Sequence, residues 1–151
     1  MQRNDGKKQG PLQAPNIRFG IVVSSYYEEI TGALLEGARA TLKEAGVEDA
    51  NIMVATVPGS FEIPYGCLSL IKNKCEAIIT LGCIVKGETE HDRHIATAVA
   101  GGITKLSLEH NVPISLGVLT TNTYEQAVAR STGANNKGIE AARAAIELSL
   151  L

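Results

Sequence analysis

The sequence has few aromatic residues and no excess of positive charge. It contains no tryptophan and only two phenylalanines among 151 residues, and its formal net charge at pH 7 is −2. Proteins that bind nucleic acid use basic patches to neutralise phosphates, and those that bind single strands add aromatic rings on which bases stack. Anionic membrane surfaces also attract basic segments. We therefore expect neither a nucleic-acid partner nor a membrane partner.

Cysteines and long apolar runs are scarce as well. Cys67, Cys75 and Cys83 are the three cysteines, and no two of them form a CxxC pair. An odd number of widely spaced cysteines indicates neither a zinc site nor a disulfide framework, so we expect reduced thiols. No apolar run is long enough to span a bilayer, and the first 16 residues lack the apolar core of a signal peptide. These features predict a soluble, cytoplasmic protein.

The composition predicts one folded domain preceded by a short arm. The hydrophobic content of 44% and the charged content of 20% are ordinary for a globular protein, and 151 residues suit a single domain. Residues 1–16 are rich in Gly, Pro, Gln and Asn. Such a composition buries little apolar surface, so we predict a flexible N-terminal arm over residues 1–16 and a domain over 17–151.

Short apolar runs alternate along the domain with longer segments of helical period. The runs predict strands over residues 17–23, 51–57, 77–85 and 113–119. The intervening segments predict helices over 28–45 and 63–73, from about 91, from a Thr123–Gln126 capping box, and over 137–150. Nearly continuous apolar strands that alternate with helices indicate a parallel sheet covered on both faces. We predict an α/β fold, a three-layer αβα sandwich with a four-stranded parallel, flavodoxin-like sheet.

Open parallel sheets bind ligands at the carboxyl ends of their strands. In the predicted sheet these ends are residues 24–28, 58–62, 82–91 and 120–123. The residues with unusual chemistry are concentrated in these segments, so we expect the functional site among them.

The second of these segments is a stiff turn between a strand and a helix. It contains Pro58, Gly59 and Pro64, which would hold Ser60 and Glu62 at the edge of the sheet. A hydroxyl and a carboxylate side by side can both bond to the hydroxyl groups of a polyol. Glu62 could equally be an acidic residue in the first turn of a helix, where it complements the helix dipole. The residues alone do not separate these two interpretations.

The third segment leaves a strand, turns at Gly87 and enters a helix near His91. Backbone N–H groups at a helix start bind anions, and the Thr89 hydroxyl could add a donor to a phosphate. His91 would then lie beside the phosphate, where an imidazole can transfer protons near neutral pH. The alternative is a solvated loop with a surface histidine.

His91 and His94 are three residues apart, and together with Glu88 and Glu90 they could form a metal site. Two acids on a flexible loop are a generic feature, so we expect no metal ion here.

Two further features are compatible with ligand binding. Tyr26 and Tyr27 follow the first predicted strand, where an aromatic ring could stack on a planar heterocycle or lie at the rim of the core. Arg130 suits phosphate recognition, although most arginines at helix ends are simply solvated.

Taken together, these segments resemble the lumazine synthase family. The matching pieces are Pro58-Gly59-Ser60-Phe61-Glu62-Ile63-Pro64, the loop Gly87-Glu88-Thr89 followed by His91, Gly117-Val118-Leu119-Thr120-Thr121 with Glu125-Gln126-Ala127, and Asn136-Lys137-Gly138. They occur in the family's order and at its spacing, over residues 17–151. The resemblance implies condensation of 5-amino-6-(D-ribitylamino)uracil with 3,4-dihydroxy-2-butanone 4-phosphate to 6,7-dimethyl-8-ribityllumazine, phosphate and water, without a cofactor or metal.

The resemblance also implies a role for each matched residue. His91 would be the catalytic proton shuttle. The ribitylaminouracil would be bound by Tyr26, which stacks on its ring, by Ser60, Phe61 and Glu62 along the ribityl chain, and near the ring by Cys83, Ile84, Val85, Leu116 and Lys137. The phosphate would be held by Gly87, Glu88, Thr89 and Arg130, of which Arg130, like Leu116, would come from a neighbouring subunit.

The chain departs from the family's usual pattern at several of these positions. Tyr26 stands where Phe or Trp is usual, and Tyr27 stands where Asn is frequent, so the mouth of the site is expected to be narrower. Leu116 replaces a usual aromatic residue and removes part of the sandwich around the ring. The connection from Arg130 to Lys137 is about one residue shorter than in many members, which affects the placement of Lys137.

The family's active sites lie between adjacent subunits of a homopentamer, and in some members twelve pentamers form an icosahedral shell of sixty subunits. Members restricted to pentamers often carry extra residues in the loop before the last helix. This chain has none there, so a shell is compatible with it as well as a pentamer. Two other functions stay open at this point. One is a catalytically weak cage protein that binds a flavin or lumazine, and the other is the related archaeal-type riboflavin synthase.

Overall fold

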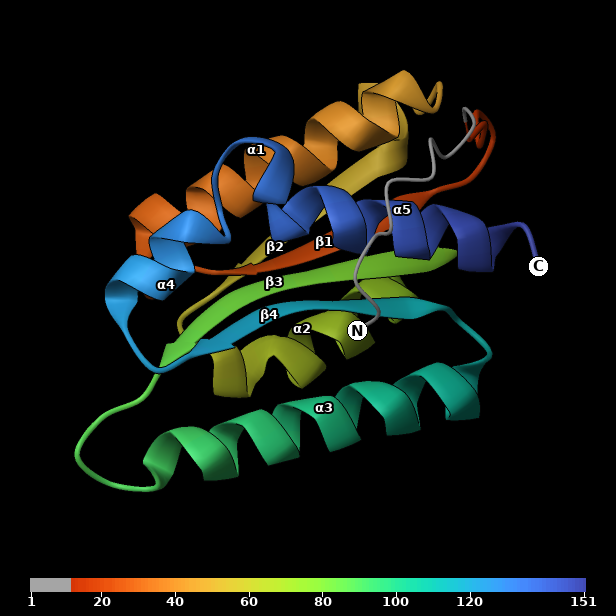
Figure 1. The fold of residues 1–151 in the computed structure, drawn as a ribbon. Helices are drawn as coiled ribbons and strands as arrows, with labels where there is room; N and C mark the ends of the chain where they lie inside the picture. Colours follow the sequence, from red (N-terminus) through yellow and green to blue (C-terminus); the bar gives the residue numbers. More distant parts are fainter. Residues whose placement is uncertain (1–11) are drawn as a thin grey trace.

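Four parallel strands form the centre of the protein (Figure 1). The computed structural model describes residues 12–151, and within them the strands are β1 (Phe19–Ser24), β2 (Ile52–Val57), β3 (Ala77–Val85) and β4 (Ile114–Thr121). Their order in the sheet is β2-β1-β3-β4, and every neighbouring pair is parallel. All four carboxyl ends therefore point to the same edge of the sheet.

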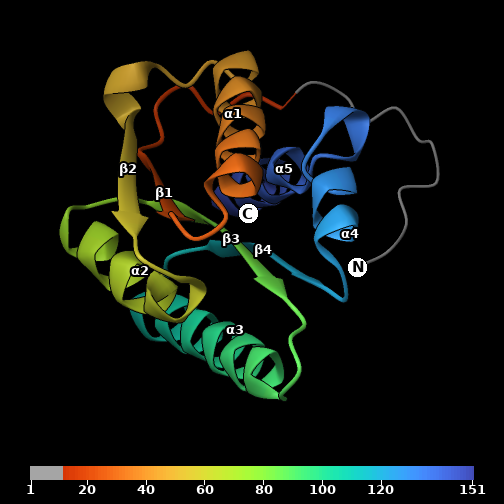
Figure 2. The ribbon, with the colours of Figure 1, turned by 90° about the vertical axis from the view of Figure 1, so that its left-hand side faces the viewer.

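Helices cover both faces of this sheet (Figure 2). On one face lie α1 (Glu28–Glu44), α4 (Tyr124–Ala129) and α5 (Lys137–Ser149), and on the other lie α2 (Ile63–Lys72) and α3 (His91–His110). Three short 3-10 turns, η1 (Asp49–Asn51), η2 (Ser60–Glu62) and η3 (Gly133–Asn135), complete the described chain. This arrangement confirms the predicted three-layer αβα sandwich with a parallel flavodoxin-like sheet.

The central strands are apolar because both of their faces are covered. Every residue of β1 and all but the last residue of β3 are buried, so neither strand has a polar face exposed to water. Two separate cores result, one on each side of the sheet. Phe19, Leu34 and Ile146 belong to the core under α1 and α5, and Val22, Ile63 and Ile103 belong to the core under α2 and α3.

Close packing of α1 against α5 depends on Asn136 and Gly138. The Asn136 side chain caps α5 by accepting a hydrogen bond from the Gly138 N–H (2.8 Å), and it donates one to the Ala33 carbonyl oxygen (2.9 Å). A Cβ at Gly138 would collide with the carbonyl oxygen of Leu34. The two helices can therefore approach this closely only because Gly138 has no side chain.

Most predicted boundaries agree with the structure to within two residues. The strand 77–85 is confirmed at both ends, and the capping box is confirmed, since Gln126 N–H donates to Thr123 Oγ1 (3.1 Å) and Thr123 N–H to Gln126 Oε1 (3.3 Å). The first strand was predicted two residues too early, because Ile17 is apolar but precedes the sheet. The fourth was predicted to end at residue 119, whereas β4 continues through two threonines to Thr121.

The predicted arm falls mainly on residues that the structure does not describe, 1–11. Of its remaining residues, Ala14 is buried, and its N–H donates to the Ala45 carbonyl oxygen at the end of α1 (2.9 Å). The last part of the predicted arm thus adds to the core. No helix within residues 12–151 is long and apolar enough to cross a membrane.

Candidate functional site

A cavity of about 630 Å³ opens at the carboxyl ends of β1 and β3. This volume is in the range of small-molecule sites. The cavity brings together ten of the residues predicted for the site: Tyr26, Ser60, Phe61, Glu62, Cys83, Ile84, Val85, Gly87, Thr89 and His91. Three of the four predicted segments therefore converge here, and the fourth, residues 120–123, does not line this cavity.

The floor of the cavity is the end of β3. Cys83 and Ile84 are buried and Val85 is half-buried, and beyond them the Lys86 N–H donates to the Thr121 carbonyl oxygen of β4 (2.8 Å). Burial raises the pKa of the Cys83 thiol to about 11, so the thiol is neutral near pH 7. A neutral thiol is a poor nucleophile. Cys83 can therefore form part of the wall but is not equipped for covalent catalysis.

The loop between β3 and α3 is exposed and leads directly to His91. The Thr89 hydroxyl accepts a hydrogen bond from the N–H of His91 (3.3 Å), the first residue of the 20-residue helix α3. No heavy atom would lie within 4 Å of a Cβ at Gly87, so the loop backbone there is open to a ligand. The Glu88 side chain is exposed and does not line the cavity.

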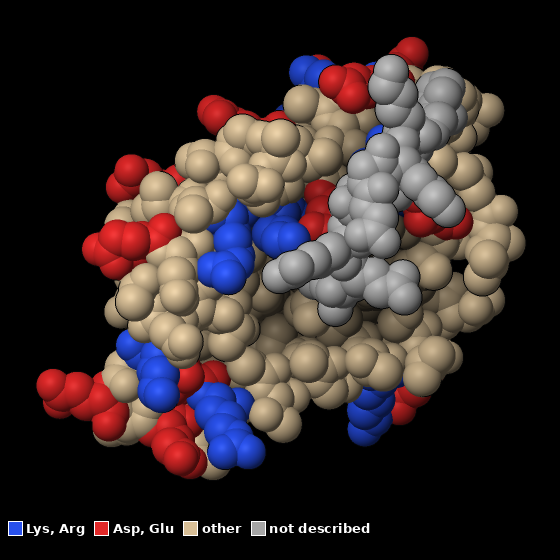
Figure 3. All heavy atoms as spheres, in the orientation of Figure 1, with Lys and Arg blue, Asp and Glu red and all other residues tan. Residues whose placement is uncertain are grey.

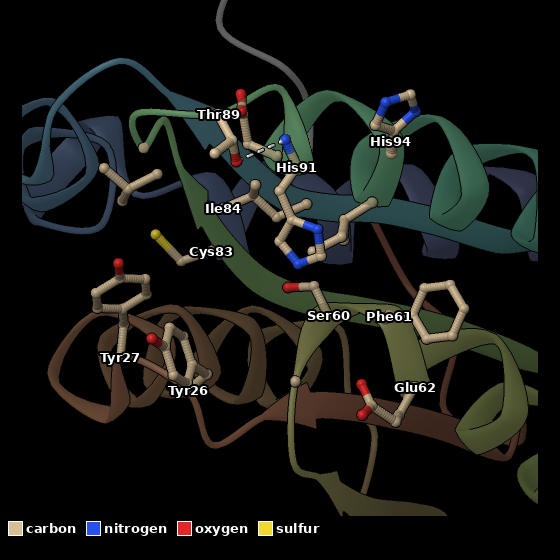
Figure 4. A pocket seen from close by; sticks show the side chains of 15 residues that line it. Tyr26, Tyr27, Ser60, Phe61, Glu62, Cys83, Ile84, Thr89, His91 and His94 are labelled. Atoms are coloured by element: carbon tan, nitrogen blue, oxygen red, sulfur yellow. Dashed lines mark hydrogen bonds between the residues drawn. The ribbon is translucent and has the colours of Figure 1, made fainter.

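His91 is the first residue of α3, and its imidazole extends into the cavity toward Ser60 (Figure 4). His94 also lines the cavity, but its ring lies farther from Ser60, along α3. Within residues 12–151 no group of three or more His, Cys, Asp or Glu side chains is placed to hold a metal ion. An imidazole, a group that can transfer protons near neutral pH, thus faces a polar turn.

That polar turn is η2, which follows Pro58 and Gly59. Ser60 is buried, and its hydroxyl has no hydrogen-bond partner among the described residues. Phe61 and Glu62 are exposed, and Glu62 makes no capping hydrogen bond to α2. A Cβ at Gly82 would lie 2.7 Å from the Ser60 hydroxyl oxygen, so β3 needs a glycine opposite this turn. The turn thus presents polar groups that a polyol could engage.

The mouth of the cavity is formed by Tyr26 and Tyr27, directly after β1. Tyr26 is 62% exposed, and its ring meets that of Tyr27 edge to face at a centroid distance of 4.7 Å. Burial is the main cause that raises the pKa of the Tyr27 phenol. An exposed ring at this place is available to stack on a flat ligand.

The remaining predicted residues lie elsewhere on the same chain. Leu116, Arg130 and Lys137 line a second hollow of about 520 Å³ between β4 and α5. Figure 3 shows the surface hollowed over β4, with lysine and arginine side chains gathered along one side of the hollow. Lys137 pairs there with Glu140 (2.8 Å), whereas Arg130 is exposed and Leu116 is 50% exposed.

Several residues of the first cavity were missed in the sequence. Gly59, Asp92 and Ile95 line it, and His94 and Tyr27 were not assigned to the site. For the residues of α3 a signal was present, because positions three and four residues after His91 share its helix face. For Tyr27 the signal was its place beside Tyr26 in the first predicted segment, residues 24–28.

Comparison with known proteins gives a consistent result. The sequence model of a family described as 6,7-dimethyl-8-ribityllumazine synthase matches residues 16–151. A protein of that description from Phocaeicola vulgatus is 47% identical over 137 residues, which cover 89% of this chain and 82% of the relative. Another, from Bacteroides fragilis, is 45% identical over 134 residues, which cover 87% of this chain and 94% of the relative.

Proposed function

The chain belongs to the 6,7-dimethyl-8-ribityllumazine synthase family, and we propose that the cavity around His91 is where it carries out the family's reaction. The protein is an enzyme of riboflavin biosynthesis. It condenses 5-amino-6-(D-ribitylamino)uracil with 3,4-dihydroxy-2-butanone 4-phosphate to 6,7-dimethyl-8-ribityllumazine, phosphate and water. The observation that carries the proposal is that η2, which follows β2, and His91, which follows β3, face each other across one cavity.

The two substrates would occupy neighbouring parts of this cavity. The ring of the ribitylaminouracil would stack on Tyr26 and lie against the end of β3, at Cys83, Ile84 and Val85. Its ribityl chain would run along Ser60, Phe61 and Glu62. The amine that attacks is already a nucleophile, so holding the reactants together supplies much of the acceleration.

The phosphate of the second substrate would be bound by the loop before α3. Backbone N–H groups of Gly87, Glu88 and Thr89 precede the positive end of a long helix, which is a favourable place for an anion. His91 would move protons during imine formation, phosphate elimination and ring closure. Such a role typically contributes on the order of 10²-fold or more to the rate.

The active enzyme is proposed to be a homo-oligomer whose sites lie between subunits. In support, Leu116, Arg130 and Lys137 line a hollow of their own, apart from the cavity of the same chain. Brought by a neighbour, Arg130 would neutralise the phosphate, and Leu116 and Lys137 would contact the ring. We propose a pentamer, with a sixty-subunit icosahedral shell as the larger alternative, and a light-scattering mass distinguishes the two.

The reaction itself tests the role of His91. Formation of the fluorescent lumazine from both substrates should exceed the spontaneous rate, and His91→Ala should lower kcat about 100-fold. His94→Ala is the matched control, because it removes a histidine of the same helix turn. If both variants lose kcat to the same extent, the proposed role of His91 is wrong.

Mixing two weakly active variants tests the shared site. Arg130→Ala loses the phosphate contact and His91→Ala loses the proton shuttle, so each homo-oligomer should be weakly active. When the two chains are coexpressed, about a quarter of the interfaces would combine an intact His91 with an intact Arg130 of the neighbour. Activity should therefore rise well above the mean of the separate variants. If the mixture shows only that mean, Arg130 does not act across an interface.

The cellular setting is also a proposal. The three cysteines are free thiols, as expected in a reducing compartment, and this supports a cytoplasmic location. The partners we propose are the two small-molecule substrates and further copies of the chain, without nucleic acid or membrane.

A further inference from the structure

Three tyrosines and one glutamate form a connected array at the mouth of the cavity. Tyr26 meets Tyr27 edge to face at 4.7 Å, and Tyr27 meets Tyr124 at a centroid distance of 5.8 Å. The Tyr124 hydroxyl donates a hydrogen bond to Glu29 Oε2 (3.0 Å). Tyr26 and Tyr27 line the cavity, whereas Tyr124 and Glu29 do not. The array therefore joins the cavity wall to groups outside it.

The backbone at Tyr27 is strained. It adopts a left-handed conformation (φ 60°, ψ 57°) in the turn immediately before α1, and this conformation costs free energy for a bulky residue. Such a conformation persists only where the surroundings determine it, and it is concentrated at functional sites. Ring contacts with Tyr26 and Tyr124, together with packing against the core under α1 and α5, favour this placement of the Tyr27 side chain.

The outer end of the array is anchored on two helices. Tyr124 is the first residue of α4, whose start is fixed by the Thr123 capping box, and Glu29 lies in the first turn of α1. The hydrogen bond between them joins residues 95 positions apart. The position of the Tyr124 ring is thus set by elements that do not contact a ligand in the cavity.

We propose that Tyr124 and Glu29 are positioning residues that hold the Tyr26–Tyr27 wall in place for the pyrimidinedione ring. This inference rests on the proposed function of the cavity. Tyr26 is 62% exposed, and without this support its side chain would lose rotational freedom when a ligand stacks on it. A fixed Tyr26–Tyr27 wall matters more in this protein than in relatives with an aromatic residue at position 116, because Leu116 cannot stack on the other face of the ring.

The substitution Tyr124→Leu removes both the ring contact and the hydrogen bond. It should raise the KM for the ribitylaminouracil about two- to tenfold, the range expected when a side chain must be ordered on binding. The KM for dihydroxybutanone phosphate and kcat should stay within about twofold, because the array lies at the ring end of the cavity. Tyr124→Phe keeps the ring and should give a smaller increase.

Two variants serve as controls. Glu29→Gln keeps an oxygen that accepts the Tyr124 hydrogen bond, so its KM should stay close to that of the unsubstituted protein. Tyr65→Leu removes a tyrosine that is 77% exposed on α2 and away from the cavity, and it should have no effect. Circular dichroism and the melting temperature of each variant report on folding separately.

Titration with 6,7-dimethyl-8-ribityllumazine, followed by its own fluorescence, measures the same contact without turnover. Its Kd should rise in Tyr124→Leu by the same factor as the KM. The inference is overturned if Tyr124→Leu leaves both constants unchanged, if it raises the two KM values equally, or if Tyr65→Leu has the same effect. A failure of the proposed function looks different, because the unsubstituted protein would then form no lumazine above background.

Discussion

Removal of the Ser60 hydroxyl should change stability and substrate affinity in opposite directions. The residue is only 7% exposed, and its hydroxyl oxygen has no hydrogen-bond partner among the described residues. A buried, unpaired hydroxyl costs about 1–3 kcal/mol relative to a solvated one. The substitution Ser60→Ala removes this cost and no apolar atom, so the free energy of unfolding should rise by about 1 kcal/mol. For a chain of this length the melting temperature should rise by about 2–4 °C.

Substrate binding by the same variant should weaken. In the proposed site a hydroxyl of the ribityl chain is the group available to pair with Ser60, and a neutral hydrogen bond contributes about 0.5–1.5 kcal/mol. The KM for the ribitylaminouracil should therefore rise about two- to tenfold, while the KM for the phosphate substrate stays unchanged.

Ser115→Ala is the matched control for this experiment. Ser115 is also buried, at 5% exposure, and its hydroxyl also has no partner among the described residues. It lies on β4 outside the cavity, and although it lines the second hollow, its hydroxyl oxygen is buried and does not face a ligand there. It should gain stability without a change in KM. Melting temperatures must be compared at equal protein concentration, because assembly stabilises the fold. A lower melting temperature for Ser60→Ala would show that its hydroxyl is satisfied in the assembled protein, and an unchanged KM would exclude it from the ribityl contact.

Two further predictions concern the fold. Gly138→Ala should lower the free energy of unfolding by more than about 2 kcal/mol, because the added methyl group would collide with the Leu34 carbonyl oxygen. Urea denaturation measures this change, with Gly101→Ala as a control in which the methyl group meets no neighbour. Burial raises the pKa of Cys83 to about 11 and that of Cys67 to about 12, so the unfolded chain ionises first and stability should fall as the pH rises above about 9. The melting temperature between pH 8 and pH 11 should fall less steeply in Cys83→Ala, and an identical slope would contradict this assignment.

The sheet could be predicted from the sequence because its signals are local. Residues 77–85 are apolar apart from Thr80. A strand of that kind requires cover on both faces, which the helices α1 and α5 provide on one side and the helices α2 and α3 on the other. The capping box needs only Thr123 and Gln126, two residues three positions apart that contact each other within one helical turn. Where the end of a strand depends on tertiary contacts, the predicted boundary differs from the observed one. Thr120 and Thr121 extend β4 because their register on β3 continues to Val85.

The site could be predicted in part, because polar residues at strand ends converge on one edge of a parallel sheet. That rule brought Ser60, Glu62 and His91 into one cavity without knowledge of the distances between them. It could not reveal Tyr124, whose contact with Glu29 depends on how α4 packs beside α1. It also could not reveal the left-handed backbone at Tyr27, since neither glycine nor asparagine stands there to signal it.

The distribution of charge around the loop before α3 explains why one chain would be insufficient for the phosphate. Between residues 86 and 93 the acids Glu88, Glu90 and Asp92 outnumber the bases Lys86 and Arg93, so the loop can offer backbone N–H groups but no surplus of positive charge. The cation assigned to this phosphate, Arg130, lies instead at the hollow over β4. A strand at the edge of the sheet is also where a second chain can approach without displacing a helix. Assembly would therefore complete the phosphate site, and a separated subunit should bind the ring of one substrate better than the phosphate of the other.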